Sequence, residues 1–366
     1  MLNNVQAVWR GQTGKGEIVM HLTNKERFTR CAFGQEIDML PIQCDFSGRG
    51  LRQFLARKGI TNVSDLELLP FFDNHVLYAY MNGATLRLKT KDSRGEASIR
   101  DEWGVDWDTD QDLYYISHPL EDWDALESYV FPDPMAPGYL DYAEDLVRRY
   151  GETHIVTAYH FCTLFERAYM LRGFENLMTD FYLEEELLEE LLDRITEFQV
   201  ALAKRYVSIG VNCGRTVDDY GTQNALMISP ALWRRFIKPR LARIIAVYRN
   251  AGLPVIHHSC GAIQPLVGDL IEIGVNVLNP IQPKVLDLPK LVEDYGDKLT
   301  FFGGICNQEV LPFRTPEEVE ENVQEMTALL GKNGRYIIAP SNGIGTDVPQ
   351  ENIDAYFRAA ERCRRI

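Results

Sequence analysis

The chain has 366 residues, of which 45% are hydrophobic and 25% are charged, as in ordinary globular proteins. Its 38 basic and 53 acidic residues give a formal charge of −15, which argues against nucleic-acid or anionic-membrane partners, and no apolar run approaches the ~20 residues of a membrane span. Residues 1–16 show no secretory signal and the seven cysteines are scattered singly, so we expect a cytoplasmic protein without disulfides whose partners are small molecules or proteins.

The first third of the chain has an irregular pattern. After a polar leader, residues 1–22, the run Thr23-Asn24-Lys25-Glu26 has the form of a capping box and opens an N-terminal helical extension. Residues 39–46 predict a first strand, and a second is placed within residues 66–81. Residues 97–116 alternate in the manner of a β-ribbon, which we expect to be an insert outside the main sheet.

From Gly138 onward the pattern is a regular alternation of strands and helices. Ser229-Pro230, for example, predicts the start of a helix that ends before Gly252. The predicted strands of this region are residues 154–161, 211–217, 253–260, 275–279, 299–305 and 335–340. Eight strands in all, with a helix after nearly every one, predict an α/β fold in which residues 23–366 form a single (β/α)8 TIM barrel. A doubly wound sheet shares this alternation, but no Gly-x-Gly-x-x-Gly follows the first strand.

Polar residues follow five successive predicted strands, where the active site of such a barrel lies. They are Asp218, Asp219, His258, Cys260, Asn279, Gln282, Cys306, Gln308, Ser341 and Asn342. Each one singly has an ordinary structural interpretation, such as a turn cap, so the convergence of several is the stronger signal.

The stretch Pro254 to Gly261 carries a candidate metal site. His258 and Cys260 are two residues apart on a strand, so their side chains point the same way, and imidazole and thiolate are ligands that zinc favours. Gly261 lets the backbone turn away from the ion. The alternative interpretation is a buried cysteine beside a hydrogen-bonded histidine, because two ligands alone make no site.

Several stretches resemble the uroporphyrinogen decarboxylase superfamily, and in particular its methyltransferase-like branch that serves corrinoid proteins. They are residues 171–175 (LRGFE), 218–223 (DDYGTQ), 257–261 (HHSCG), 303–305 (GGI) with Gln308, and 348–352 (VPQEN). The resemblance implies one barrel. It also implies zinc bound through His258 and Cys260, which match the His-x-Cys motif of the branch. The arginine-rich motif of the decarboxylases is missing, since residues 45–50 read DFSGRG.

The resemblance implies that the third ligand is a cysteine near the last strand. This chain has Asn342 in that region, and neither a cysteine nor a histidine. Cys306, at the end of the preceding strand, is one possible replacement, and an oxygen of Glu166 or Asp219 is another. We expect Asp219 and Glu166 to act in catalysis if they are not ligands. The remaining polar residues are expected to bind substrate: Asp218, Asn279, Gln282, Gln308 and Asn342.

The expected function is a zinc-dependent methyltransferase that moves a methyl group between a small molecule and a corrinoid protein. The cobalamin is expected on the partner, because the chain has no Asp-x-His-x-x-Gly; the nearest run, Asp73-Asn74-His75, lacks the glycine. Two alternatives remain open: a cofactor-free decarboxylase of the uroporphyrinogen decarboxylase type, and a non-catalytic member that binds a corrinoid or tetrapyrrole.

Overall fold

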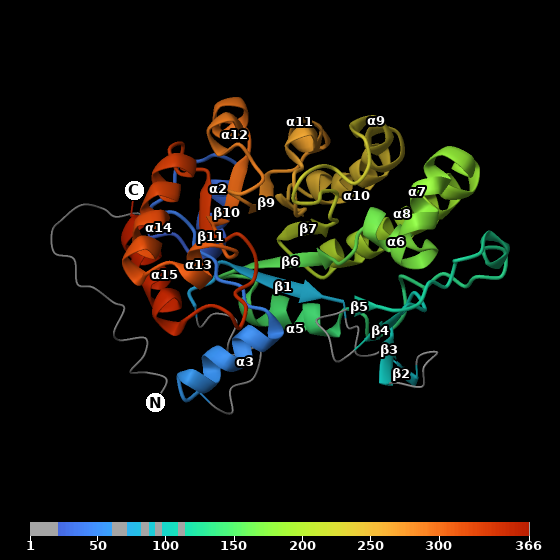
Figure 1. The fold of residues 1–366 in the computed structure, drawn as a ribbon, viewed down its shortest axis with the longest axis horizontal. Helices are drawn as coiled ribbons and strands as arrows, with labels where there is room; N and C mark the ends of the chain where they lie inside the picture. The colour runs from blue at the N-terminus through green and yellow to red at the C-terminus, as the bar shows by residue number, and fades with distance from the viewer. Residues whose placement is uncertain (1–20, 61–71, 82–87, 92–96, 109–113, 366) are drawn as a thin grey trace.

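A curled parallel sheet of seven strands forms the centre of the molecule (Figure 1). The computed structural model describes residues 21–60, 72–81, 88–91, 97–108 and 114–365, so almost all of the predicted leader lies outside the described residues. In order across the sheet, which is also chain order, the strands are β1 (Val76–Tyr80), β6 (Ile155–His160), β7 (Cys213–Val217), β8 (Val255–His258), β9 (Val277–Ile281), β10 (Thr300–Ile305) and β11 (Tyr336–Pro340). With helices outside it, this sheet gives a TIM-barrel-like α/β fold.

The predicted first strand, residues 39–46, is not a regular strand. Ile42 forms an isolated parallel bridge with Ile338 of β11, and the carbonyl oxygen of Ile42 accepts a hydrogen bond of 3.4 Å from the His75 N–H beside β1. This segment therefore lies between the first and last strands of the sheet, in the place of an eighth strand. Pro41 interrupts the segment, and a proline has no N–H for a ladder.

On the side of this segment that faces β1, hydrogen bonds from side-chain amides replace the missing backbone ladder. The Cys44 N–H donates to Asn74 Oδ1 at 2.8 Å, and the Val76 N–H donates to Gln43 Oε1 at 3.0 Å. Gln43 Nε2 in turn donates to the carbonyl oxygen of Val76 at 3.1 Å. The predicted second strand is confirmed in its last part, as β1, and its first part falls on residues outside the described ones.

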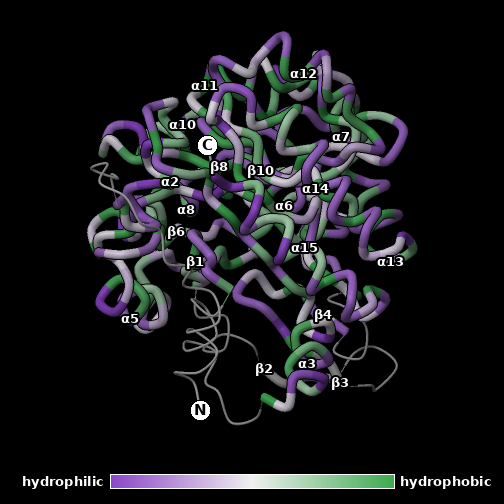
Figure 2. Tube along the Cα trace, turned by 90° about the vertical axis from the view of Figure 1, so that its left-hand side faces the viewer, coloured by the Kyte–Doolittle hydropathy of each residue, from purple (hydrophilic) through white to green (hydrophobic). Residues whose placement is uncertain are grey.

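Helices surround the sheet and alternate along their length between hydrophobic and hydrophilic residues (Figure 2), as expected where one face packs on the sheet. They are α2 (Asn24–Ala32), α3 (Gly48–Arg57), α5 (Asp141–Tyr150), α6 (Phe165–Arg172), α7 (Phe174–Leu183), α8 (Glu185–Ser208), α9 (Pro230–Leu232), α10 (Lys238–Asn250), α11 (Val267–Ile273), α12 (Leu288–Tyr295), α13 (Val310–Phe313), α14 (Pro316–Leu330) and α15 (Gln350–Cys363). Among the described residues, no helix combines the length and the apolar character needed to cross a membrane.

Two predicted helix starts are confirmed in detail. Thr23 and Glu26 form the predicted capping box at the start of α2. Ser229 caps α9, with Pro230 as the first helical residue. The helix predicted to follow without a break contains a π-helical segment, Trp233–Ile237, before α10.

A second, antiparallel sheet follows the carboxyl end of β1 (Figure 1). Its strands are β2 (Leu88–Lys91), β3 (Ala97–Arg100), β4 (Asp106–Asp108) and β5 (Tyr114–Tyr115). The prediction of a β insert outside the main sheet is confirmed, although the insert begins earlier than expected. Trp103 fixes the insert to the helices. Its indole is buried, and the centroid of its ring lies 4.8 Å from that of Phe198 in α8.

Alternate residues of each central strand face the interior of the sheet. At the amino end these residues are apolar and pack on Phe28, Cys31 and Ala32 of α2. On β8 the same face carries Ile256, then His258, and continues to Cys260. The interior thus changes from apolar to polar along the strands, and the polar end is the carboxyl end.

Candidate metal centre

Three candidate ligands meet at the carboxyl ends of β7 and β8. Asp219, His258 and Cys260 each offer one ligand atom, and all three atoms lie within 4.8 Å of one another. Cys260 Sγ is 3.6 Å from His258 Nε2, and this nitrogen is 3.9 Å from Asp219 Oδ1. We call these three residues the ligand cluster.

Backbone hydrogen bonds of the loop after β8 fix the positions of the cluster residues. The Cys260 N–H donates to Asp219 Oδ1 at 2.7 Å, and the next N–H, of Gly261, donates to Gln282 Oε1 at 2.7 Å. Gly261 has φ +88°, and a Cβ there would lie 2.2 Å from the carbonyl oxygen of Gly221. The two backbones can approach only because position 261 is glycine.

Asn279 fixes the tautomer of His258. Asn279 Nδ2 donates to the carbonyl oxygen of Phe302 at 3.3 Å, so its Oδ1 is the atom that faces His258 Nδ1, at 2.6 Å. Arg215 Nη2 donates to the same Oδ1 at 2.9 Å. His258 Nδ1 must then carry the hydrogen, which leaves the lone pair on Nε2, the nitrogen beside Cys260. Burial, followed by the charge of Arg215, lowers the pKa of His258 and keeps the ring neutral.

The donor set of the cluster suits zinc. Burial, followed by the charge of Asp219, raises the pKa of Cys260, so an anionic sulfur here requires a compensating cation. Bonds of ~2.3 Å to sulfur and ~2.0–2.1 Å to nitrogen give a tetrahedral S···N edge of roughly 3.6 Å, and the Sγ···Nε2 separation here is 3.6 Å. Thiolate, imidazole and carboxylate together therefore fit a zinc ion.

The loop after β11 also reaches the cluster. Asn342 is exposed, and its Nδ2 donates to Cys260 Sγ at 3.6 Å. The resemblance places a cysteine ligand in this region, and the structure places an amide there instead. Cys306 is buried at the end of β10 and belongs to no group of three candidate ligands within the described residues.

Glu166, at the start of α6, lies beside the cluster. Burial, followed by the charges of Asp219 and Asp218, raises the pKa of Glu166 well above its usual value. Tyr169 donates a hydrogen bond of 3.2 Å to Glu166 Oε1. A carboxyl group whose pKa is raised by its surroundings thus lies next to Asp219.

Asp218 faces the opposite way from Asp219, as neighbours along an extended chain do. It is fully buried, and its two oxygens accept hydrogen bonds from the backbone N–H groups of Phe165 (2.9 Å) and Glu166 (2.7 Å). Burial raises the pKa of Asp218 to about 7, although these backbone hydrogen bonds oppose the increase. Asp218 holds the start of α6 and thereby positions Glu166; the structure does not bring it into the cluster.

The other predicted substrate-binding residues have different surroundings. Asn279 and Gln282 are buried and support the cluster through the hydrogen bonds described above, whereas Gln308 and Asn342 are exposed at the strand ends. Their predicted contacts with substrate stay predictions.

Arg215 was missed by the sequence reasoning. Its guanidinium lies inside the sheet, 4.6 Å from the ring centroid of Tyr78 and 5.5 Å from that of Tyr159. Its side chain is buried, and its Nε and Nη1 have no hydrogen-bond partner. A charged residue in the middle of the predicted strand VNCGRTV is a signal that could have found it.

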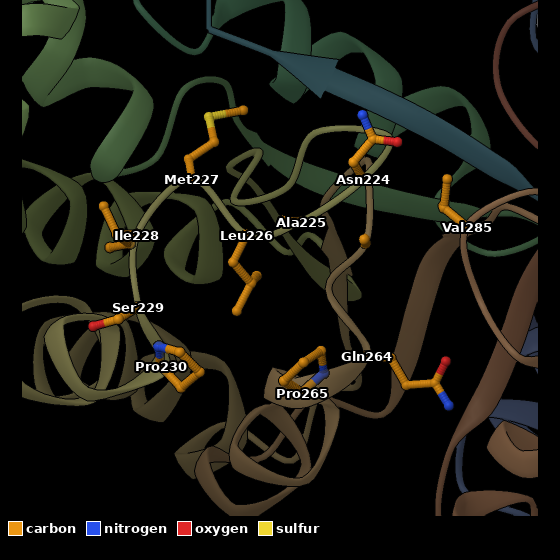
Figure 3. Close-up of a pocket in the computed structure, with 11 residues that line it drawn as sticks. Asn224, Ala225, Leu226, Met227, Ile228, Ser229, Pro230, Gln264, Pro265 and Val285 are labelled. Atoms are coloured by element: carbon orange, nitrogen blue, oxygen red, sulfur yellow. The ribbon is translucent and has the colours of Figure 1, made fainter.

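A mostly apolar cavity of about 530 Å³ lies beside the loops that carry the cluster (Figure 3). It is lined by residues 224–230, which follow Asp219 in the chain, by Ala262, Gln264 and Pro265, which follow Cys260, and by Val285. Its volume is in the range of small-molecule sites.

Comparisons with known proteins identify the family of this chain. Residues 103–363 match the family model described as uroporphyrinogen decarboxylase (URO-D). A uroporphyrinogen decarboxylase of Thermus thermophilus is 31% identical over 107 residues, which is 29% of this chain and 30% of that protein. The match thus spans less than a third of that relative.

Two methyltransferases match over longer stretches. The methylcobamide:CoM methyltransferase MtbA of Methanosarcina acetivorans is 24% identical over 253 residues, 68% of this chain and 70% of the relative. A solved structure of a methyltransferase from Methanosarcina mazei shares the fold with a TM-score of 0.68, at 16% identity over 93% of this chain and 99% of that one. Because the family model covers well over half of the chain, the protein belongs to the uroporphyrinogen decarboxylase family. Within this family, its longer matches are to methyltransferases, so it resembles the methyltransferase-like branch.

Proposed function

We propose that the protein is a zinc-dependent methyltransferase that moves a methyl group between a small molecule and the cobalt of a corrinoid protein. The ligand cluster carries this proposal: oxygen, nitrogen and sulfur ligand atoms lie within 4.8 Å of one another at the carboxyl end of the sheet. The methyltransferase relative gives independent support. The corrinoid is assigned to a partner because the sequence has no Asp-x-His-x-x-Gly motif.

Each residue of the site has a separate task in this proposal. Asp219, His258 and Cys260 hold the ion, which supplies a Lewis acid for the heteroatom that gains or loses the methyl group. Asn279 keeps the His258 lone pair on Nε2. Glu166, whose raised pKa favours the protonated form, lies beside Asp219 in the position of a general acid.

Decarboxylation of a polycarboxylic substrate is the second candidate. The 31% identity with a decarboxylase over 107 residues favours it, and so does the guanidinium of Arg215, two nitrogens of which have no partner. A non-catalytic tetrapyrrole-binding protein is the third. Neither of these alternatives uses a metal ion, so metal content separates them from the methyltransferase.

The test is the zinc content of the protein purified without chelator, in the parent and in Cys260→Ser and Cys306→Ser. We expect about one zinc per chain in the parent and in Cys306→Ser, and none in Cys260→Ser, since zinc sites need at least three protein ligands. Cobalt substitution adds an independent measurement, because a thiolate–cobalt charge-transfer band should appear in the parent and disappear in Cys260→Ser. A parent protein without zinc contradicts the proposal. Loss of zinc in Cys306→Ser would show that Cys306 is a zinc ligand.

A further inference from the structure

Aromatic rings form a continuous arc beside the ligand cluster. The arc consists of Tyr80, Tyr159, Phe161, Trp107, Tyr115 and Tyr169. Successive ring centroids along it are separated by 4.5, 6.4, 6.2, 6.1 and 5.9 Å, in that order. These separations lie within the range of direct aromatic contacts. We call this set the aromatic arc.

The arc approaches the cluster from two sides. Next to its first ring, Tyr80, the Tyr159 ring contacts Arg215, whose Nη2 lies 3.2 Å from Nδ1 of His258. At the other end, the Tyr169 hydroxyl donates to Glu166, whose carboxyl adjoins Asp219. The arc therefore runs from the histidine side of the cluster to its carboxylate side.

The rings on β1 and β6 lie on the same face of the sheet as the cluster. Tyr159 pairs with Arg215 of β7, and the interior positions two residues further on are Phe161 and Val217. Val217 pairs with His258 of β8. Tyr159 thus lies on the same interior wall as His258, two positions nearer the amino end, and Phe161 follows just beyond the end of β6.

Part of the arc is open to solvent. Tyr80 is 46% exposed and Phe161 is 39% exposed. Large exposed aromatic residues beside a polar cluster are typical of a binding surface rather than of a folded core.

Charge decides which aromatic-binding ligand fits. Rings of this kind also bind cations, but the Arg215 guanidinium already lies over Tyr78 and Tyr159. A second cation would meet this charge at close range. A neutral, flat ligand can stack on the exposed rings without that repulsion.

We propose that the aromatic arc binds the ring of a neutral aryl methyl ether, so that the methyl-bearing oxygen lies at the ligand cluster. This inference rests on the proposed function, because it names the class of methyl donor for the same site. A small aliphatic donor would leave the arc without a role.

Binding of guaiacol (2-methoxyphenol), measured by isothermal titration calorimetry on the protein purified without chelator, tests the inference. We expect saturable binding of guaiacol and none of 2-methoxyethanol or tetramethylammonium at the same concentrations. Phe161→Leu should weaken guaiacol binding roughly 2- to 12-fold, the amount expected for one aromatic contact. Phe33→Leu is the matched control, because Phe33 is also 39% exposed but lies at the end of α2 at the amino end of the sheet.

Three results overturn the inference: no saturable guaiacol binding, equal binding of either comparison ligand, or equal weakening in Phe33→Leu. Zinc content measured on the same preparations separates this result from the fate of the proposed function. Zinc without guaiacol binding rejects only the aryl ether. Guaiacol binding without zinc retains the arc as an aromatic site and rejects the metal-dependent function.

Discussion

The two ends of the central sheet both bury charged groups, but they treat those groups differently. At the amino end the charges are paired: Arg27 donates to both oxygens of Asp38, at 2.7 and 2.8 Å, and both side chains are almost fully buried. Arg364, near the end of α15, pairs with Asp73 at 2.7 Å. These pairs join residues from both ends of the chain beneath the sheet.

His75 completes the amino end as a neutral ring. Its Nδ1 faces the carbonyl oxygens of Ile42 and Asp73, at 3.1 and 3.0 Å, and so carries the hydrogen. Its Nε2 lies 3.2 Å from Arg27 Nη1 and 3.4 Å from Arg364 Nη2, and accepts from them. Every polar group of His75 is therefore satisfied without a ligand.

The carboxyl end leaves its groups incomplete. Asp219 and Cys260 are two potential anions at one point, the pKa of Glu166 is raised by its acidic neighbours, and two nitrogens of Arg215 have no partner. The comparison teaches that the paired groups of the amino end stabilise the fold, whereas the groups of the carboxyl end are arranged to bind a ligand that the chain itself does not contain. Three changes test this division.

The largest expected effect is at the amino end. Asp38→Ala leaves Arg27 buried without its partner and should lower the free energy of unfolding by about 3–5 kcal/mol in urea denaturation. Asp354→Ala, which removes an exposed partner of Lys58, is the control and should cost ~1 kcal/mol or less. Equal losses in the two variants would mean that the buried ion pair contributes no more to the free energy of unfolding than the exposed one.

Part of the pH dependence of stability should also originate at the amino end. Burial, followed by the charge of Arg364, lowers the pKa of His75 to about 3, against ~6.5 in the unfolded chain. Below pH 6.5 the unfolded chain binds a proton that the folded protein does not, so His75 contributes stability above pH 6.5 that is lost as the pH falls towards 3.

Between pH 7 and pH 5 this loss amounts to about 2 kcal/mol for one histidine. The measurement is urea denaturation at the two pH values in the parent and in His75→Gln. His160 and His257 are also buried with lowered pKa values, so the parent slope is a sum and the informative quantity is the difference between the two proteins. An unchanged slope in His75→Gln would assign the pH dependence to those histidines.

The smallest expected effect on stability is at the carboxyl end. Asp219→Asn keeps an oxygen that can accept from the Cys260 N–H and removes a negative charge next to Glu166. We expect the free energy of unfolding to change by ~1 kcal/mol or less, while zinc is lost from the purified protein. A loss of stability as large as that in Asp38→Ala, with zinc retained, would make Asp219 a structural cap.

Much of this architecture follows from local sequence signals. The capping box at Thr23 and the Ser229-Pro230 helix start were predicted because a cap involves only neighbours in the chain. Six of the seven strands of the central sheet, from β6 to β11, were predicted from apolar runs with flanking turn residues, and β1 was placed only within the wider range 66–81. The shared face of His258 and Cys260 also follows from the chain alone, because side chains alternate along a strand.

Long-range contacts decided the rest. Residues 39–46 have the composition of a strand, but Pro41 and the amide side chains of Gln43 and Asn74 replace the ladder with isolated contacts. The sequence shows Asp218 and Asp219 as a pair, and only the packing of α6 against the end of β7 assigns one to a helix start and the other to the ligand cluster.

The sequence by itself therefore determined the order of elements, the barrel-like class and the shared face of the two candidate ligands at the end of β8, since each depends on residues close together in the chain. Only the tertiary structure decided that Asp219 lies beside these two residues, that Asn279 directs the His258 lone pair, and that Arg215 and the aromatic arc lie next to them. Those contacts join residues from different strands, and their distances follow from the curl and register of the sheet rather than from any local pattern.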